Sequence, residues 1–414
     1  MVTSTFCEDQ SEAMAARDGK IGERMEVEED KTSIESMAAR GGHVDAEMTE
    51  FKYGEVADED RSRTRRPRRR TEARKQMEDY QEVFDSYLQG LESKVGHFGY
   101  TSLVSPMHFT HYTPRQVTSD YTTRGITLQI FSFKIANISL DLEWPLLQWP
   151  LKVYGVVAAR DNVDRKRNVL FHRQRDNFQE ITQEDPFLCL TGPSRAISAE
   201  SPLEFEVQLK LKGGHAESED SVLINRKGHF GGYHTDNGLY TVTFDNCLCT
   251  AELSLQKLYR GAVQATFLRV GIVKGSQSPF SYGGRVACSS PPQEDVVRGS
   301  EGPAAPTQVV LLDSRYCAGG KMPIGEEDGY LDLSRHVVSL ELRTVSEDSE
   351  ELEETLKVVV EAYSPGGSVQ AAVMVRPQYC GISKHKCDLN GSKVKITIAW
   401  SPIISSAFTK KVIL

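Results

Sequence analysis

The residues with the clearest chemical meaning are seven arginines that lie within ten positions of the chain. They are Arg61, Arg63, Arg65, Arg66, Arg68, Arg69 and Arg70. Guanidinium groups bind phosphate oxygens, so the run predicts sequence-independent, salt-sensitive contact with a nucleic acid. Short Lys/Arg-rich stretches also serve as nuclear-import addresses. No aromatic residue lies within the run, so base stacking is not implied. Both interpretations stay open, as does a run with no specific role.

Metal-ligating residue types gather most closely near the C-terminus. Cys380, His385 and Cys387 lie within eight residues, and thiolate and imidazole groups are common zinc ligands. A closed zinc site needs a fourth ligand, and no second pair with zinc-finger spacing occurs in the chain. We interpret the segment as a hairpin loop with ordinary thiols and predict no metal ligand.

Two histidine pairs have a spacing that could serve chemistry. His108 and His111 lie between two prolines, which favour a loop over a helix. His229 and His234 bracket the stretch FGGY, which is typical of a mobile hairpin loop. Neither pair predicts a site.

Known catalytic motifs are absent from the sequence. Residues 192–196 (GPSRA) lack the closing glycine of a nucleophile elbow. No Walker A loop, Gly-x-Gly-x-x-Gly fingerprint, His-Glu-x-x-His motif or EF-hand loop occurs. Because active sites assemble from residues far apart in sequence, this absence does not exclude an enzyme. We predict no catalytic or cofactor-binding residue and no cofactor, and we favour a protein that is not an enzyme.

Charge is distributed unevenly along the N-terminal part. Residues 1–60 hold 17 acidic and 6 basic side chains, and the arginine run follows directly. High charge and few large apolar residues predict that residues 1–70 are disordered, first acidic and then arginine-rich. The first 20 residues lack the apolar core of a secretory signal. We therefore expect an intracellular protein of the nucleus or cytoplasm, without a membrane partner, whose eight cysteines are reduced thiols.

An amphipathic helix is predicted over residues 71–95. Its apolar residues recur at spacings of three and four and so share one stripe; they are Met77, Tyr80, Phe84, Tyr87 or Leu88, Leu91 and Val95. Pro67 is expected to keep the helix out of the arginine run, with Thr71 as the N-cap. The stripe favours a helix docked on its own domain. A helix that binds a partner or a second copy of the chain is the alternative.

From about residue 125 the apolar period changes from that of a helix to that of a strand. In residues 203–212 five apolar residues alternate with five polar ones, which indicates a half-buried antiparallel strand. Further strands are predicted at 126–142, 151–158, 239–244, 263–273, 308–312, 337–343, 356–362, 369–375 and 393–398. Within 126–142 the alternation slips in phase, which predicts a bulge or a crossing between sheets.

The chain is organised around this β-rich part. A connecting segment is predicted over residues 96–124, and a β domain over residues 125–414. Residues 289–306 are rich in proline, glycine and charge and indicate a long loop or an internal linker. No second helix separates the strands, which favours an all-β antiparallel sandwich, either one domain or two packed subdomains.

Several β segments, taken in order, resemble a plant family abundant in grasses and catalogued as a domain of unknown function. The resemblance rests on LQIFSFKI (128–135), WPLKVYGVVAARD (149–161), NVLFHRQRDNFQEIT (168–182), LCLTGPSRA (188–196) and LEFEVQLKLKG (203–213). It implies no activity of its own. Some relatives are fused to ribosome-inactivating N-glycosidase domains, which implies an rRNA-directed hypothesis. The catalytic Glu-x-x-Arg of those domains does not occur in this chain.

Three functions follow from these observations. The first is a non-enzymatic interaction module with a protein partner, because the strands are well patterned and no catalytic motif occurs. The second is an rRNA-directed N-glycosidase or an accessory to one. The third is a protein that binds nucleic acid through the arginine run.

Overall fold

The computed structural model of the protein describes the helix over residues 58–95 and most of the β-rich part. The described β-rich residues are 122–123, 125–139, 147–163, 166–231, 239–273, 278–290, 308–325, 328–343, 353 and 355–404. Within the helix, side chains are described for residues 71–91. The described residues do not include residues 1–57, the pair His108 and His111, nearly all of the connecting segment, or residues 291–306 of the predicted loop.

The described chain is mostly β-strand, as predicted, and all its sheets are antiparallel. The strands are β1 (Thr122–Thr123), β2 (Gly125–Ile138), β3 (Leu151–Arg160), β4 (Asn168–Arg173), β5 (Gln179–Ile181), β6 (Ile197–Ser198), β7 (Leu203–Leu211), β8 (Ser221–Phe230), β9 (Leu239–Asp245), β10 (Cys249–Ile272), β11 (Gly284–Ser289), β12 (Val309–Asp313), β13 (Val337–Glu341), β14 (Leu356–Ser364), β15 (Gly367–Val375), β16 (Gly381–Leu389), β17 (Ser392–Ser401) and β18 (Ile403–Ile404). Short 3₁₀ turns include Ser314–Tyr316.

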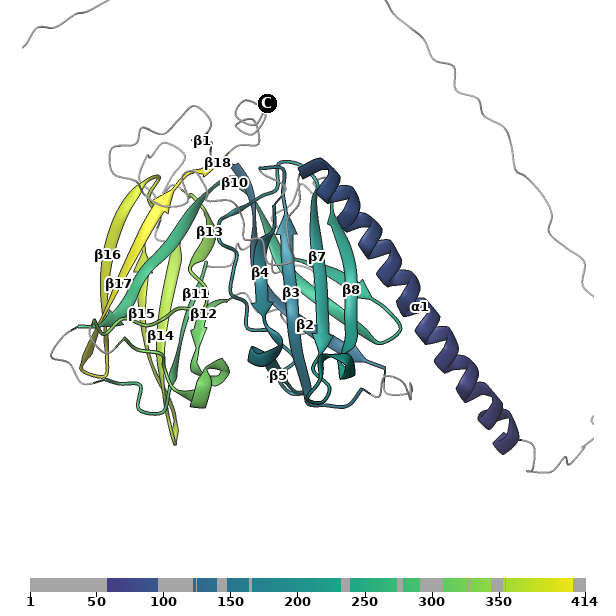
Figure 1. The fold of residues 1–414 in the computed structure, drawn as a ribbon. Coiled ribbons are helices and arrows are strands. Elements are labelled where there is room, and N and C mark those ends of the chain that lie inside the picture. Colours follow the sequence, from purple (N-terminus) through teal and green to yellow (C-terminus); the bar gives the residue numbers. More distant parts are fainter. Residues whose placement is uncertain are drawn as a thin grey trace, which may run out of the picture. The chain divides into compact units, whose positions relative to one another are not determined.

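Three sheets carry the fold (Figure 1). A seven-stranded sheet runs in the order β16-β17-β10-β2-β6, with β9 and β13 also paired to β10. A five-stranded sheet has the order β4-β3-β7-β8, with β5 on β3, and a four-stranded sheet has the order β12-β11-β14-β15. Strands β1 and β18 form a separate pair. Strand β10 is 24 residues long and pairs with β2 and β9 along its first half and with β13 and β17 along its second.

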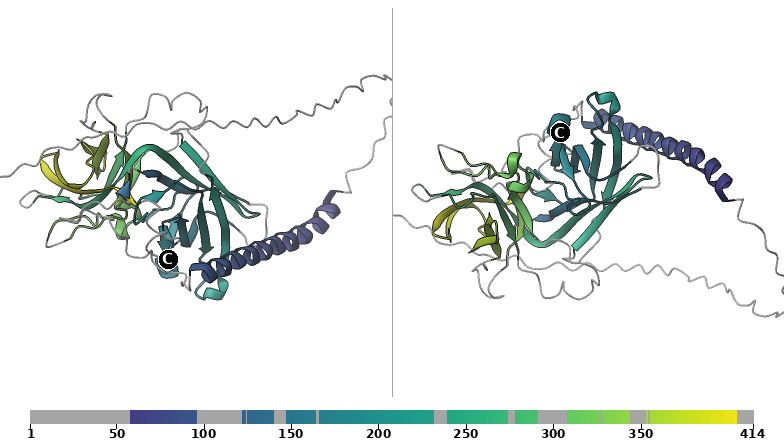
Figure 2. Two further views of the ribbon diagram at one scale, coloured as in Figure 1. Left: turned by 90° about the horizontal axis from the view of Figure 1, so that it is seen from above. Right: turned by 90° about the horizontal axis from the view of Figure 1, so that it is seen from below.

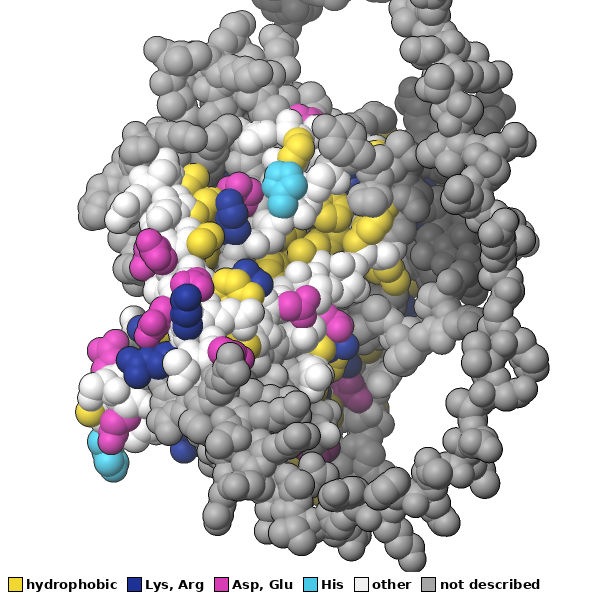
Figure 3. Space-filling model, turned by 90° about the vertical axis from the view of Figure 1, so that its right-hand side faces the viewer, with side chains coloured by type: hydrophobic (Ala, Val, Ile, Leu, Met, Phe, Trp, Pro, Cys, Tyr) yellow, Lys and Arg dark blue, Asp and Glu magenta, His cyan; other side chains and the backbone are white. Residues whose placement is uncertain are grey.

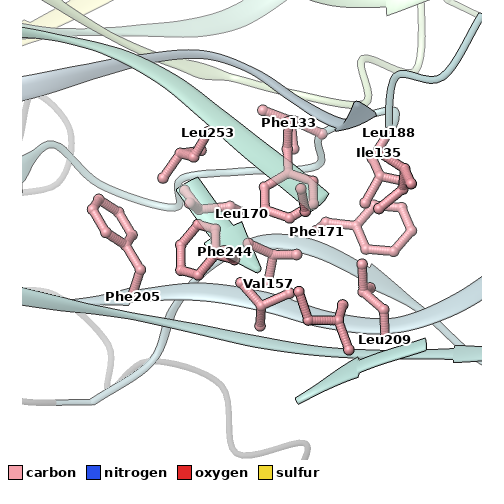
Figure 4. Close-up of a cluster of buried hydrophobic side chains, with 14 of the residues drawn as sticks. Phe133, Ile135, Val157, Leu170, Phe171, Leu188, Phe205, Leu209, Phe244 and Leu253 are labelled. Carbon is pink, nitrogen blue, oxygen red and sulfur yellow. The ribbon is translucent and has the colours of Figure 1, made fainter. Parts of the chain in front are cut away.

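Two hydrophobic cores lie on the seven-stranded sheet. The first core joins β2, β9 and the first half of β10 to the five-stranded sheet, and it includes Phe133, Phe171 and Phe205. Figure 4 shows these aromatic rings packed among leucine, isoleucine and valine side chains from both sheets. The second core joins the other half of β10, β13 and β17 to the four-stranded sheet, and it includes Phe267 and Trp400. Sheet-on-sheet burial of alternate side chains is the packing of a β-sandwich.

Strand β2 contains the bulges that its phase slips predict. Its register against β10 shifts so that Phe131 and Ala136 are each left without a partner residue in the ladder. An unpaired residue turns the following side chains to the other face of a sheet. Phe131 accordingly joins the second core, whereas its neighbours Ile130 and Phe133 belong to the first. The bulge at Phe131 is therefore where one strand serves both cores.

Helix α1 (Asp58–Val95) packs on the outer face of the five-stranded sheet, beside β8. Phe84, Leu88 and Leu91 are buried, and Met77 packs against the first core, as the apolar stripe predicts. The Tyr87 hydroxyl donates to Glu204 Oε2 over 2.8 Å. The described half of the helix is thus docked on its own domain, and the N-terminal turns extend past the sheet (Figure 2).

The predicted helix start at Thr71 is wrong. The helix begins at Asp58 and continues through the arginine run and Pro67, so the backbone of residues 58–70 is helical where disorder was predicted. Arginine and glutamate favour a helix, and a proline removes one backbone donor without forbidding the turns on either side. Among the described residues, no helix combines the length and the apolar character that crossing a membrane requires.

Candidate ligand-binding pocket

Buried charge is the first signal of a site in a domain without catalytic motifs, and the described residues contain two kinds. In the first kind, each charged group has an oppositely charged partner. Glu206 on β7 is fully buried, and its two carboxylate oxygens accept from Arg160 Nε and, over 2.6 Å, from Arg167 Nε. Burial beside Glu206 and Glu204 raises the pKa of the Tyr87 hydroxyl on α1. The helix therefore seals this ion cluster from solvent.

A second buried ion pair involves Asp161, the residue that follows Arg160 in the chain. Arg195 donates from both terminal nitrogens to the two oxygens of Asp161, one of them over 2.6 Å. The same carboxylate accepts the backbone N–H groups of Ser198, over 2.9 Å, and Val163, over 3.1 Å. Arg160 Nη2 and Arg195 Nε are buried without a hydrogen-bond partner, but each of these arginines has a carboxylate that balances its charge. Buried charges that are paired in this way hold a fold together. We assign a structural role to both clusters.

The second kind of buried charge lines a pocket where the two cores meet. The pocket has a volume of about 340 Å³, within the range of small-molecule sites. We call it the junction pocket. Its walls come from β2, the segment before β6, β11, β12, the turn after β12 and the segment before β13. The lining residues are Phe131, Ser132, Glu184, Asp185, Phe187, Leu188, Cys189, Leu190, Arg285, Gln308, Val310, Leu311, Leu312, Asp313, Arg315, Tyr316, Ser334 and Arg335.

One wall of the junction pocket is fixed by a paired charge network. Arg315 donates from Nη2 to Asp313 Oδ2 over 2.7 Å, and the Tyr363 hydroxyl donates to Asp313 Oδ1 over 3.1 Å. The Tyr316 hydroxyl donates to Asp185 Oδ2 over 2.7 Å, which ties the turn to the segment before β6. Burial, together with Asp185, raises the pKa of Tyr316, so its hydroxyl keeps its proton. These groups are occupied by one another.

Two other arginines of the pocket are not paired. Arg335 is 1% exposed, and its side chain donates over 2.7 Å from Nη2 to the Ile130 carbonyl, while its Nε has no partner. The Nε of Arg285, on β11, is also buried without a partner. Neither of its cross-strand neighbours, Asp313 or Glu361, forms an ion pair with it. Arg285 is half-buried, whereas Arg335 is enclosed and has no carboxylate partner among the described residues. Buried charges are normally paired, so the charge of Arg335 requires an explanation.

The lining lacks two of the usual catalytic bases. No histidine or lysine is among the residues that line the pocket. The thiol of Cys189 lies in the wall, and burial raises its pKa, which disfavours the reactive thiolate.

The structure does not bring the sequence-predicted candidates into this pocket. The predicted loop from Cys380 to Cys387 is mostly strand β16. Cys380 directly precedes this strand, and roughly 23 Å of extended chain separates it from Cys387. His385 is committed to a contact with Ser383 over 2.8 Å, and no group of three metal-ligating side chains occurs in the described part. His229 is exposed and lies one residue before the end of β8, and His234 lies outside the described residues. The seven cysteines that the structure describes are free thiols.

The arginine run lies on the helical backbone of α1, and its side chains are outside the described ones. On the face of the molecule that Figure 3 presents, described Lys/Arg and Asp/Glu side chains are interspersed and form no patch of one sign. This face therefore lacks the continuous basic surface that binds a nucleic-acid backbone.

Comparison with known proteins places the β-rich part in one family, whose description states no function. A family model described as a domain of unknown function (DUF6598) matches residues 127–398. The match covers all lining residues of the junction pocket and the buried ion pairs of Glu206 and Asp161. No curated protein matches the chain.

Proposed function

Since the chain belongs to the DUF6598 family, whose description states no activity, we propose that its β-rich part is a non-enzymatic binding module. The junction pocket is its ligand site. The observation that carries this proposal is a cavity of about 340 Å³ between two cores, with incomplete buried donors in its wall. Ligand sites are typically concave, mostly apolar and equipped with a few placed polar groups.

The apolar part of the lining gives the pocket its capacity for binding. The lining includes Leu188 and Leu190 of the first core and Leu311 and Leu312 of the second core. Each contributes hydrophobic contact at roughly 25 cal/mol per Å² of apolar area that a ligand removes from water. The polar groups then set the orientation of the ligand.

A fragment screen on the full-length chain tests this function. We expect some fragments of about ten to fifteen heavy atoms to raise the melting temperature, because a ligand of the native state adds RT ln(1 + [L]/Kd) to its stability. The variant Val310→Trp places an indole in the pocket wall and should abolish these shifts. Val369 is 41% exposed on β15 and lines no part of the pocket, so Val369→Trp is the matched control. Hits that Val310→Trp leaves unchanged would contradict the proposal.

The other functions predicted from the sequence stay predictions. A protein partner, nucleic-acid contact or nuclear import through the arginine run, and an N-glycosidase role in a plant protein each need their own assay. One observation argues against Glu206 as the catalytic glutamate of an N-glycosidase. Glu206 is fully buried, and both its carboxylate oxygens accept hydrogen bonds from arginine.

A further inference from the structure

The guanidinium group of Arg335 is buried without a counterion. Its side chain is almost fully enclosed, and its one described acceptor is a neutral carbonyl, that of Ile130. Burial lowers the pKa of Arg335 to about 10, and no carboxylate offsets this effect. The titratable group that does interact with it is the thiol of Cys288, whose pKa burial raises to about 12. A neutral thiol supplies no charge at physiological pH, so the positive charge of Arg335 is uncompensated.

Such an arrangement is costly in a folded protein. Buried charges are normally paired, because removing an ion from water costs far more than an ordinary hydrogen bond returns. The same chain pairs each of its other enclosed arginines with a carboxylate, as Arg160, Arg167 and Arg195 show. Arg335 differs from these arginines because it has no carboxylate partner among the described residues, and it lines the junction pocket. An anionic ligand would complete it.

Arg285 gives the site a second donor. It lies in the same lining, its Nε is buried and without a partner, and it forms no ion pair with a described carboxylate. Two arginines in the lining of one cavity suit the two oxygens of a carboxylate, because each guanidinium group offers directed N–H donors.

The remaining charges of the pocket decide between a singly and a doubly charged ligand. The charges of Asp313 and Arg315 neutralise each other. Asp185 is held by Tyr316, and Glu184 is exposed at the rim. Two free positive charges therefore face two carboxylates of the same lining. A monoanion is attracted to the arginines with less repulsion from these acids than a phosphate dianion would meet.

We propose that the junction pocket binds an organic carboxylate with an apolar body, whose carboxylate pairs with Arg335 and Arg285 and whose body lies against the leucines of both cores. This inference rests on the proposed function and specifies the class of its ligand. The apolar body is required by the lining, in which Phe131, Leu188, Leu190 and Val310 surround the polar groups. The carboxylate is required by the two incomplete donors.

Isothermal titration calorimetry on the full-length protein with matched probes tests this assignment. The probes are benzoate and hexanoate, their neutral amides benzamide and hexanamide, the cation benzylamine, and phenyl phosphate. We expect the carboxylates to bind and the amides and the amine to bind at least roughly tenfold more weakly, since a hydrogen bond to a charged group is stronger than one between neutral groups. Phenyl phosphate is expected to bind more weakly than benzoate. Tighter binding of phenyl phosphate would overturn the carboxylate assignment.

Three variants attribute the binding to the named residues. Arg335→Met should weaken benzoate on the order of 30-fold, and Arg285→Met on the order of tenfold, from the lost charge-assisted hydrogen bonds. Arg269, exposed on β10 against the Tyr330 ring, lines no part of the pocket, so Arg269→Met is the control and should leave affinity unchanged. Near-ultraviolet circular dichroism establishes that each variant is folded, and Arg285→Met keeps the test open should Arg335→Met not fold.

The outcomes separate this inference from the proposed function. Neutral or cationic fragments that bind and are lost in Val310→Trp, with no preference for carboxylates, would overturn the ligand class and leave the binding module standing. No probe and no screened fragment in the pocket would overturn both. Carboxylate binding that both Arg335→Met and Arg285→Met leave intact would place the anion elsewhere and overturn the assignment.

Discussion

Replacing Arg335 by methionine should stabilise the ligand-free protein. Methionine keeps an unbranched apolar stem of similar length and removes the buried charge. The pKa of Arg335 falls from 12.5 to about 10 through burial, which corresponds to a penalty of about 3 kcal/mol on the charged form. The penalty disappears with the guanidinium group.

The opposing cost of this substitution is small. The Ile130 carbonyl that accepts from Arg335 also accepts from Gln129 Nε2 over 2.7 Å, so it keeps a donor. The lost hydrogen bond then costs about 1 kcal/mol. The net expected gain is about 2 kcal/mol in the free energy of unfolding, measured by urea denaturation at pH 7 with the slope m unchanged.

A contrasting variant controls for general effects of removing an arginine from the pocket. Arg315→Met removes the partner of Asp313, whose side chain is 1% exposed. We expect it to destabilise by about 1–3 kcal/mol, because a buried carboxylate loses its charged donor. A loss of stability above about 1 kcal/mol in Arg335→Met would refute the reasoning, since it would make Arg335 a structural residue. Benzoate at a hundredfold excess over the wild-type Kd should stabilise the wild type by about 2.7 kcal/mol, and Arg335→Met, with an affinity about 30-fold weaker, by only about 0.9 kcal/mol.

Three further expectations concern the scaffold. Glu206→Ala leaves two arginines buried without their shared carboxylate and should cost about 3–5 kcal/mol in urea denaturation, and a loss below about 1 kcal/mol would contradict the structural role. Phe84→Ala should lower the free energy of unfolding by about 3–5 kcal/mol and speed amide exchange in β8 under α1. Val83 is 62% exposed on the same helix, so Val83→Ala should change that free energy by no more than about 0.5 kcal/mol. Equal effects of the two variants would contradict the docked helix. Asp220 accepts from Arg175 over 2.7 Å and from the Tyr154 hydroxyl over 2.6 Å, and the hydrogen bonds of Arg175 foremost lower its pKa from 3.8 to about 2. The folded carboxylate keeps its charge to lower pH than the unfolded one, so its contribution to stability is full above about pH 4 and is lost as the pH falls towards about 2. Asp220→Asn should therefore lower the free energy of unfolding by about 1 kcal/mol at pH 7, after screening by solvent, and leave it unchanged near pH 2. A difference in stability that persists near pH 2 would contradict this.

The strands could be predicted from the sequence because half of each one is buried. Residues 203–212 alternate strictly, and β7 occupies Leu203–Leu211 with its apolar side chains in the first core. The phase slip near Phe131 marks a real bulge, because each face of β2 serves a different core there. Strands β8 and β16 escaped prediction, since lysine, histidine and asparagine interrupt their alternation.

The helix start and the junction pocket could not be predicted, for different reasons. Pro67 signals a boundary by local rules, but the helix-favouring residues on both sides continue the turns through it. The pocket draws on segments from Phe131 to Arg335, so no local spacing contains it. Its one local signal is a single arginine within an apolar strand, as Arg285 is in the GRVACS of β11. Sequence alone cannot show that such an arginine lacks a partner.

A crystal structure of the full-length protein grown with benzoate tests the central claim most directly. The account predicts one benzoate in the junction pocket, with its carboxylate oxygens about 2.7–2.9 Å from guanidinium nitrogens of Arg335 and Arg285 and its ring against the leucines of both cores. A junction pocket that stays closed by its own side chains in the presence of saturating benzoate, or benzoate bound away from Arg335, would contradict it.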